Sequence, residues 1–255
     1  MSDGQSAPGS DMEERPVKLV YILHAPKGRD EESTRELLLG DVARRLVERG
    51  ARRLSMDIRD ADSRVKSPAP RMLFEKPIGA LVNLWIEDVE GRAPFEQVLR
   101  SAGFTCHGFH VDESVYTDYG DNRHAGRRDW PDGGRSPGIM AVTLMKRPRR
   151  LARDEWIRRW HGTMSPVSEE IQPRARYVRN LVIRSLTQGA PPYEGIVEEA
   201  WPSKKHITSP WLFYGADSAA RLAVNMMRVL RAVTSFLDLM QIHTAMMSEY
   251  FIKTD

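Results

Sequence analysis

The residues best suited to acid–base chemistry lie in the first half of the chain, on stretches that alternate as β-strands do. His24 ends the run VKLVYILH, Asp57 lies in RRLSMDIRD, and His110 lies in FTCHGFHVDESVY. Histidine exchanges protons near neutral pH, and a carboxylate beside it fixes its tautomer and its orientation. We therefore predict that His24, Asp57 and His110 form the catalytic group of an enzyme.

The choice of His110 over His107 rests on strand geometry. The two histidines differ by three positions, so on a regular strand their side chains face opposite sides. His110 is assigned to the site because Phe109 and Val111 then belong to the opposite, more apolar face. The alternative for each histidine is a hydrogen-bonded structural role in the core or at its rim.

The sequence also contains tryptophans that could form an aromatic wall and a lysine that could bind an acidic substrate. Tryptophans supply large apolar surfaces, each with one N–H donor, and Trp85 on a predicted strand is assigned to the substrate site. Lys146 ends a strand at the position that matches His24 when the two halves are aligned. Its ammonium group suits a substrate carboxylate or phenolate. Core packing is the alternative for each tryptophan.

The order of the predicted elements indicates the scaffold that holds these residues. Each half reads strand, helix, strand, strand, helix, strand, and Ser33 with Glu36 fits a capping box at the start of the first helix. The predicted strands span 17–26, 52–60, 78–88, 104–116, 138–148, 176–185, 193–201 and 245–253. The predicted helices span 33–50, 93–103, 153–164 and a long stretch from about Asp217.

This β-α-β-β-α-β order is the ferredoxin-like pattern. An antiparallel sheet with helices on one face needs cover on its other face, and a second sheet provides it. We therefore predict an α+β fold in which two tandem ferredoxin-like units pack their antiparallel sheets as a pseudo-dimeric α+β barrel. The expected divisions are a disordered tail (1–15), the first repeat (16–119), a linker loop (120–137) and the second repeat (138–255).

Short stretches of the second half resemble the EthD-like family of dimeric α+β barrel proteins. They are LMKRPRRLARDEWIRRW, MSPV, RYVRN and YEGIVEE, in that order within residues 139–201. Where the family has a histidine on its helix, this chain has Met164, and His161 lies three residues earlier. The resemblance implies the barrel fold and a cavity. It also implies kinship with cofactor-free cyclases, dehydratases and small monooxygenases that act on aromatic compounds.

The same resemblance implies substrate-binding residues in the second half. Tyr177, Asn180 and Glu198 occupy positions that match the family pattern, and His161 neighbours the position of the family histidine on the helix surface. Tyr177 and Asn180 face opposite sides of their strand, so we expect one to line the cavity while the other supports the sheet. The segment 203–215, SKKHITSPWLFYG, is expected to close over the cavity.

Composition and absent motifs exclude several classes of protein. The single cysteine, Cys106, excludes a disulfide scaffold and a cysteine-rich metal site. The 38 Lys+Arg residues nearly balance the 35 Asp+Glu residues, so we expect no nucleic-acid partner. The chain lacks a phosphate-binding loop, a dinucleotide fingerprint and a His-Glu-x-x-His motif, so we expect no organic cofactor and no metal. It also lacks a secretory signal and an apolar run of about 20 residues, which predicts a cytoplasmic protein with no membrane partner.

These observations predict a cofactor-independent enzyme that acts on an aromatic or polyketide-like small molecule. The predicted chemistry is proton transfer, as in a cyclase, dehydratase, decarboxylase or another lyase. One alternative is a protein that binds an aromatic ligand without changing it, and another is a haem-binding or oxygen-using α+β barrel protein. The chain is expected to act as a monomer whose two halves form the barrel, or as a homodimer.

Overall fold

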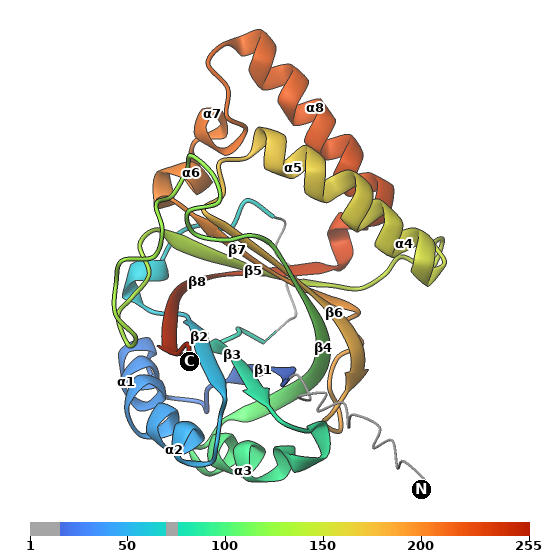
Figure 1. The fold of residues 1–255 in the computed structure, drawn as a ribbon. Coiled ribbons are helices and arrows are strands. Elements are labelled where there is room, and N and C mark those ends of the chain that lie inside the picture. Colours follow the sequence, from blue (N-terminus) through green and yellow to red (C-terminus); the bar gives the residue numbers. More distant parts are fainter. Residues whose placement is uncertain (1–15, 70–75) are drawn as a thin grey trace, which may run out of the picture.

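The computed structural model describes residues 16–69 and 76–255, so the tail expected at 1–15 lies outside the described residues. Eight antiparallel strands close into a barrel in the order β1-β3-β2-β8-β5-β7-β6-β4 (Figure 1). The strands of the first half are β1 (Val17–His24), β2 (Arg53–Ile58), β3 (Ala80–Ile86) and β4 (Thr105–Thr117). Those of the second half are β5 (Ile139–Met145), β6 (Arg176–Ser185), β7 (Gly195–Trp201) and β8 (Ile242–Lys253).

The barrel consists of two ferredoxin-like sheets joined along both edges. Each half forms a four-stranded sheet of the same order, β4-β1-β3-β2 in the first and β8-β5-β7-β6 in the second. The pairs β2–β8 and β4–β6 then close the ring, so each of the eight described strands has a neighbour on both sides. The predicted pseudo-dimeric α+β barrel is confirmed.

Elements of the two halves begin at matching positions in the sequence. The first helical segment comprises α1 (Glu31–Leu37), a π-helical turn (Leu38–Val42) and α2 (Ala43–Glu48). Its counterpart comprises α4 (Arg153–Arg159), a π-helical turn (Trp160–Met164) and α5 (Ser165–Ile171). The strand, the helix and the π-helical turn of the second half each begin the same number of residues after their counterparts. Since π-helical turns are rare, two at matching positions indicate an internal duplication.

The structure corrects the start of the helix predicted at 33–50 and the end of the helix predicted at 153–164. The first helix begins at Glu31 and not at Ser33, because Asp30 is the N-cap: its carboxylate accepts from the Ser33 backbone N at 2.8 Å. The helical segment expected to end at Met164 continues to Ile171. Pro166 lies directly after the π-helical turn, in the first turn of α5, and does not stop the segment.

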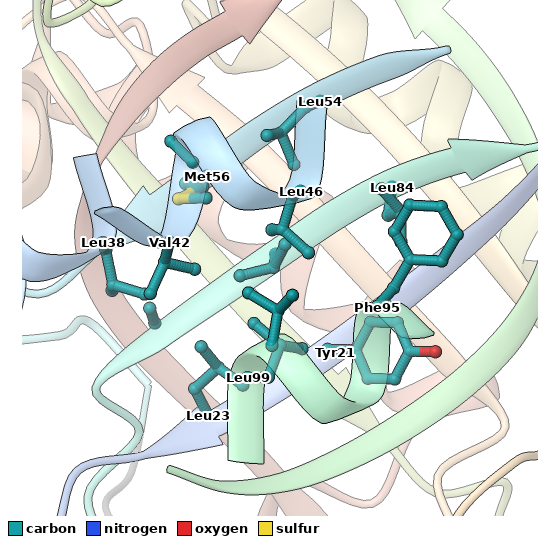
Figure 2. Packing of buried hydrophobic residues seen from close by; sticks show 14 of the residues in the cluster. Tyr21, Leu23, Leu38, Val42, Leu46, Leu54, Met56, Leu84, Phe95 and Leu99 are labelled. Atoms are coloured by element: carbon teal, nitrogen blue, oxygen red, sulfur yellow. The ribbon is translucent and has the colours of Figure 1, made fainter. Parts of the chain in front are cut away.

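Helices cover the outer faces of both sheets. In the first half, apolar residues of β1, β2 and β3 pack against α1, α2 and α3 (Ala93–Ser101), and Figure 2 shows Leu38, Leu46 and Leu99 in one apolar cluster with Tyr21 and Leu23. In the second half, α4, α5 and the long helix α8 (Ala219–Phe236) lie over the sheet. The short helices α6 (Lys204–Thr208) and α7 (Pro210–Phe213) connect β7 to α8. The other face of each sheet lines the barrel interior.

The loop predicted at 120–137 is part of the barrel wall. Gly133 N donates to Phe251 O at 2.6 Å, and Ser136 N donates to Glu249 O at 2.8 Å. The loop therefore continues the sheet along the end of β8 and covers one end of the barrel. Within residues 16–69 and 76–255, no helix combines the length and the apolarity that crossing a membrane requires.

Candidate functional site

An apolar cavity of about 260 Å³ lies between the outer face of the second sheet and the helices above it. Strands β5, β6, β7 and β8 form its floor, and the π-helical turn (Trp160–Met164), α7 and α8 contribute to its roof. Its walls are rich in aromatic side chains, namely Trp160, Tyr177, Trp201, Phe213, Tyr214 and Phe236. A cavity with this lining suits a flat, mostly apolar small molecule.

The cavity depends on a close approach between the sheet and the π-helical turn. A side chain at Gly195 would place its Cβ 2.8 Å from Met145, 3.0 Å from Trp156 and 3.1 Å from Trp160. Glycine at this position therefore lets both tryptophan rings lie against β7. Phe213 and Tyr214 close another side of the cavity, as the prediction for 203–215 requires.

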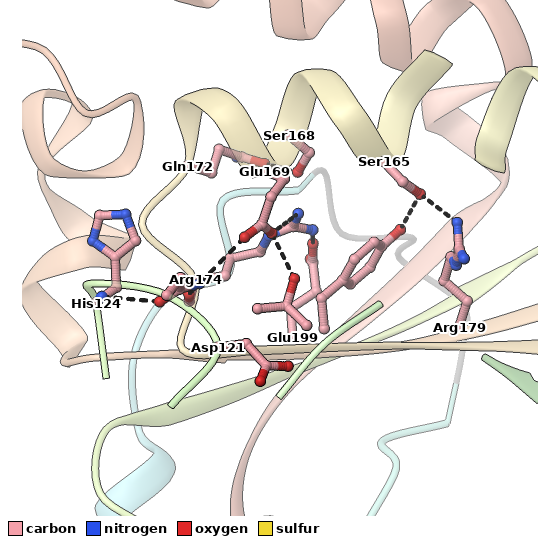
Figure 3. A network of polar contacts seen from close by, with 12 residues as sticks. Asp121, His124, Ser165, Ser168, Glu169, Gln172, Arg174, Arg179 and Glu199 are labelled. Atoms are coloured by element: carbon pink, nitrogen blue, oxygen red, sulfur yellow. Dashed lines mark hydrogen bonds and ion pairs between the residues drawn. The ribbon is translucent and has the colours of Figure 1, made fainter. Parts of the chain in front are cut away.

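Two polar side chains face each other at the edge of the cavity. Tyr177 on β6 is directly opposite Glu199 on β7 in the strand register, and both line the cavity. Arg174 lies behind them with its side chain fully buried, and its Nη1 donates to Glu199 Oε1 at 2.8 Å. Figure 3 shows the Arg174 guanidinium between Glu199 and Glu169. Arg174 Nη2 lies 3.4 Å from Glu169 Oε2. Glu199 is therefore held as an oriented carboxylate.

The Tyr177 hydroxyl is fixed by its neighbours and stays protonated. Trp160 Nε1 donates to it at 3.0 Å, and Ser165 Oγ lies 3.4 Å away. Burial raises the pKa of Tyr177, although the Arg174 guanidinium acts in the opposite direction. The phenol is thus a neutral hydrogen-bond donor at neutral pH.

Three of the predicted site residues meet in a different place, inside the barrel. Glu198 accepts from Asn180 Nδ2 at 2.7 Å and from Lys18 at 3.2 Å, and Asn83 Nδ2 donates to it at 2.7 Å. Asp57 is buried nearby, and its Oδ2 has no hydrogen-bond partner among the described residues. The parity prediction is confirmed, because Asn180 faces the barrel interior while Tyr177 faces the helices.

The pKa values of two carboxyl groups in this interior cluster are shifted in opposite directions. Burial raises the pKa of Asp57 well above its usual range, and the neighbouring Glu198 and Glu249 carboxylates raise it further. Burial also acts to raise the pKa of Glu198, but the charges of Lys18 and Arg176 outweigh it and the pKa is lowered. Asp57 is therefore the protonated member of the cluster and Glu198 the ionised one.

The predicted catalytic residues do not form one group. His24 contacts His107 edge to face, with ring centres 5.5 Å apart, and its Nδ1 lies 2.9 Å from Pro77 O. His110 lies on the opposite face of β4 from Phe109, which packs in the barrel interior. Among the described residues, no hydrogen bond joins any two of His24, Asp57 and His110.

The remaining predicted residues are spread over the molecule. Lys146 lies 5.6 Å from the centre of the Tyr193 ring, outside the cavity lining. His161 packs edge to face on Trp160, and burial together with the Arg179 charge lowers the pKa of His161 to about 4. Trp85 lies at one end of the barrel, where Lys18 Nζ is 4.8 Å from its ring centre.

Sequence reasoning missed Glu199, Arg174 and Lys18. Strand alternation places Glu199 on the face opposite Glu198, so the face that carries Tyr177 was the available signal for Glu199. Buried cations such as Arg174 and Lys18 leave no local signal, because arginine and lysine are usually exposed.

The residues of the cavity do not fit a haem held by histidine. A haem protein of that kind needs an imidazole as axial ligand, and the described residues that line the cavity include no histidine. Within residues 16–69 and 76–255, no three His, Cys, Asp or Glu side chains gather as a metal site. We therefore derive no reaction step through haem or a metal.

Comparisons with known proteins identify the fold. The chain is similar to the solved structure of an anthrone oxidase-like protein, with a TM-score of 0.55 and 11% identity over 94% of each chain. It is also similar to a dye-decolorizing peroxidase from Bacteroides thetaiotaomicron, with a TM-score of 0.46 and 9% identity over 94% of each chain. A chlorite dismutase from Candidatus Nitrospira defluvii gives a TM-score of 0.44 and 9% identity over 94% of this chain and 92% of that one.

At 11% identity, the first likeness supports the fold alone, and the other two are too weak to carry an argument. The fold is an eight-stranded antiparallel α+β barrel similar to that of the anthrone oxidase-like protein, with both halves of the barrel supplied by one chain. No family model matches the sequence, and no curated protein matches it.

Proposed function

We propose that the chain is an enzyme that transfers a proton at a carbon atom made acidic by a carbonyl group of an aromatic or polyketide-like molecule. The observation that carries this proposal is the pairing of Tyr177 with Glu199 at the polar edge of an aromatic cavity. The resemblance of residues 139–201 to the EthD-like family supports the same class of substrate.

Each polar residue has a defined part in the proposed step. The Glu199 carboxylate removes a proton from the carbon atom, and the electron pair of the broken C–H bond moves into an enolate. The Tyr177 phenol donates a hydrogen bond to the enolate oxygen, where negative charge develops. Arg174 is a positioning residue, because it holds Glu199 without reaching the substrate. The enolate then attacks a second carbonyl carbon in a cyclisation, or expels a β-hydroxyl group, which takes the proton from Glu199 and leaves as water, in a dehydration.

The cavity wall supplies the conditions for this chemistry. Exclusion of water strengthens the hydrogen bond from Tyr177 to the enolate, and the rings of Trp160 and Phe236 hold a flat substrate against the sheet. His24, Asp57 and His110 take no part, because none of them lines the cavity. No organic cofactor or metal is required for the proton transfer.

Exchange of a substrate proton for deuterium tests the proposal. The likeness to an anthrone oxidase-like protein suggests anthrone as the probe, because the CH₂ group of this three-ring ketone is conjugated with the carbonyl through the rings and loses a proton to give an enolate. The full-length protein is incubated anaerobically with anthrone in D₂O, and loss of the CH₂ signal is followed by NMR. We expect exchange faster than in buffer, and about 100-fold slower exchange with Glu199→Gln, since a general base contributes roughly 10²–10⁴-fold.

A matched variant separates a catalytic carboxylate from a merely structural one. Glu170→Gln removes an exposed carboxylate from α5 and should exchange deuterium at the unaltered rate. Tyr177→Phe should slow exchange at least tenfold through loss of the donor to the enolate. Anthrone that binds in the cavity but exchanges no faster than in buffer would contradict the enzyme proposal and favour a binding protein.

A further inference from the structure

A second pocket of about 240 Å³ lies at the end of the barrel that the 118–128 segment covers. It is separate from the apolar cavity, because it opens among β2, β3, β4, β6 and β8 on the inner side of the sheets. Cationic and aromatic side chains alternate around it, namely Arg53, Trp85, Tyr119, Arg128, Arg176 and Phe251. We call this pocket the barrel mouth.

Arg53 lines the barrel mouth and forms no ion pair with any residue that the structure describes. The two carboxylates of the lining accept from other cations, Glu113 from Lys18 at 2.7 Å and Asp118 from Arg176 at 3.0 Å, and these two cations also pair with Glu198 and Glu249 inside the barrel. The Arg53 side chain is exposed, and its guanidinium carbon lies 4.6 Å from the Trp85 ring centre. Its charge is therefore available to an anionic ligand.

Two further cations support an anionic ligand. Lys253 also lines the barrel mouth, and its Nζ donates to a neutral acceptor, Ala51 O, at 3.2 Å. Arg128 pairs with Asp132 through Nη2, but its Nε is buried and has no partner among the described residues. This N–H group is available to an acceptor from outside the chain.

The aromatic residues define the body of the ligand. The Arg128 guanidinium lies 4.6 Å from the Phe251 ring centre, and Trp85 is flanked by both Lys18 and Arg53. Cations held on ring faces form a flat surface on which a further ring can stack. An aromatic ligand can stack on these guanidinium planes, whereas a bare inorganic anion cannot.

We propose that the barrel mouth is a second ligand site, which binds a small aromatic carboxylate. The carboxylate lies among Arg53, Lys253 and Arg128, and the ring stacks beside Trp85 and Phe251. The site is independent of the proposed enzyme activity, because none of its residues lines the apolar cavity.

Calorimetric titration of the full-length protein tests this site with three probes. 2-Naphthoate carries both the ring and the charge, 2-naphthamide carries the ring without the charge, and inorganic phosphate carries charge without a ring. We expect saturable binding of 2-naphthoate at low salt, weakened by added NaCl, and at least tenfold weaker binding of both other probes. Equal affinity for the naphthamide, preference for phosphate, or no binding of 2-naphthoate would each overturn the proposal.

Variants then locate the bound carboxylate. Arg53→Met should weaken 2-naphthoate binding roughly tenfold or more, because it removes a charge-assisted hydrogen bond. Arg44→Met removes the same charge from the exposed face of α2 and should bind as the unaltered chain does. Thermal melts check that both variants fold.

A variant of the other cavity keeps the two proposals distinct. Val229→Trp fills the apolar cavity from α8 and should leave 2-naphthoate binding unchanged. Loss of binding in Val229→Trp, with binding retained in Arg53→Met, would place the naphthoate in the apolar cavity and overturn the second site. The deuterium exchange at Glu199 is measured separately and does not depend on this result.

Discussion

The guanidinium carbon of Arg174 lies 3.9 Å from the centre of the Tyr177 ring, and the Arg174 side chain has no exposed surface. The same guanidinium bonds Glu199, so one buried cation supports both polar residues at the cavity edge. The two side chains that we propose to touch the substrate thus depend on a third that does not. This arrangement resembles other sites in which a buried neighbour fixes the reacting groups.

Arg174→Met is expected to destabilise the protein. It removes a cation–π contact and leaves the largely buried Glu199 carboxylate without its cation, so we expect a loss of about 3 kcal/mol in the free energy of unfolding. Urea unfolding measures the change. Arg158→Met, at an exposed ion pair on α4, is the control and should cost less than about 1 kcal/mol. Equal effects of the two substitutions would refute the structural role of Arg174.

Lys18→Met should lower the free energy of unfolding more than the double substitution Lys18→Met/Glu198→Gln does. Lys18 is buried inside the barrel between Glu113 and Glu198, so Lys18→Met leaves the Glu198 charge uncompensated, at a cost of about 3–5 kcal/mol. The double variant Lys18→Met/Glu198→Gln should recover part of this loss, because it removes the stranded charge. A double-mutant cycle in urea measures the coupling. Strictly additive losses would show that the two side chains do not interact.

Asp57→Asn should make the protein more stable at pH 8 than the unaltered chain. The pKa of Asp57 is raised in the folded protein, so between its ordinary value near 3.8 and its raised value the folded state binds a proton that the unfolded state has lost. Stability therefore falls as pH rises through this window. Asparagine mimics the protonated carboxyl and removes the dependence. Urea midpoints from pH 4 to pH 8 should converge at low pH; parallel curves would contradict the assignment.

His161 should stay neutral between pH 5 and pH 8. Burial and the Arg179 charge lower the pKa of His161 to about 4, below its ordinary value near 6.5. In the window between the two values the unfolded state binds more protons, so this histidine lowers stability as pH falls. NMR titration of the His161 ring protons measures the pKa directly. Arg179→Met should move that pKa upward, whereas a midpoint already near 6.5 would exclude the predicted environment.

Much of the fold follows from local patterns in the sequence. Alternating strands and the repeated β-α-β-β-α-β order predict both sheets, and matching positions such as Pro26 and Pro148 predict the duplication. The Asp30 N-cap was missed because Ser33 and Glu36 offer a competing capping pattern a few residues later. The π-helical turns have no known local signature of this kind and depend on packing against the sheet.

The candidate site was predicted in part, for a physical reason. Strand alternation correctly places Tyr177 and Asn180 on opposite faces of β6, but it does not say which face adjoins the cavity. The family resemblance favours Glu198, although Glu199 is the carboxylate that shares a face with Tyr177. Pairings such as Glu199 with Arg174 join strand β7 to the residues before β6, and such contacts depend on tertiary structure.

Binding of the three-ring ketone to two variants of one helix tests the central claim most directly. Val229 on α8 lines the apolar cavity, whereas Val224 on the same helix is 57% exposed and lies outside the lining. Calorimetric titration under anaerobic conditions should show binding to the unaltered chain and to Val224→Trp, and no binding to Val229→Trp. Equal binding by both variants would contradict the claim that this cavity holds the substrate.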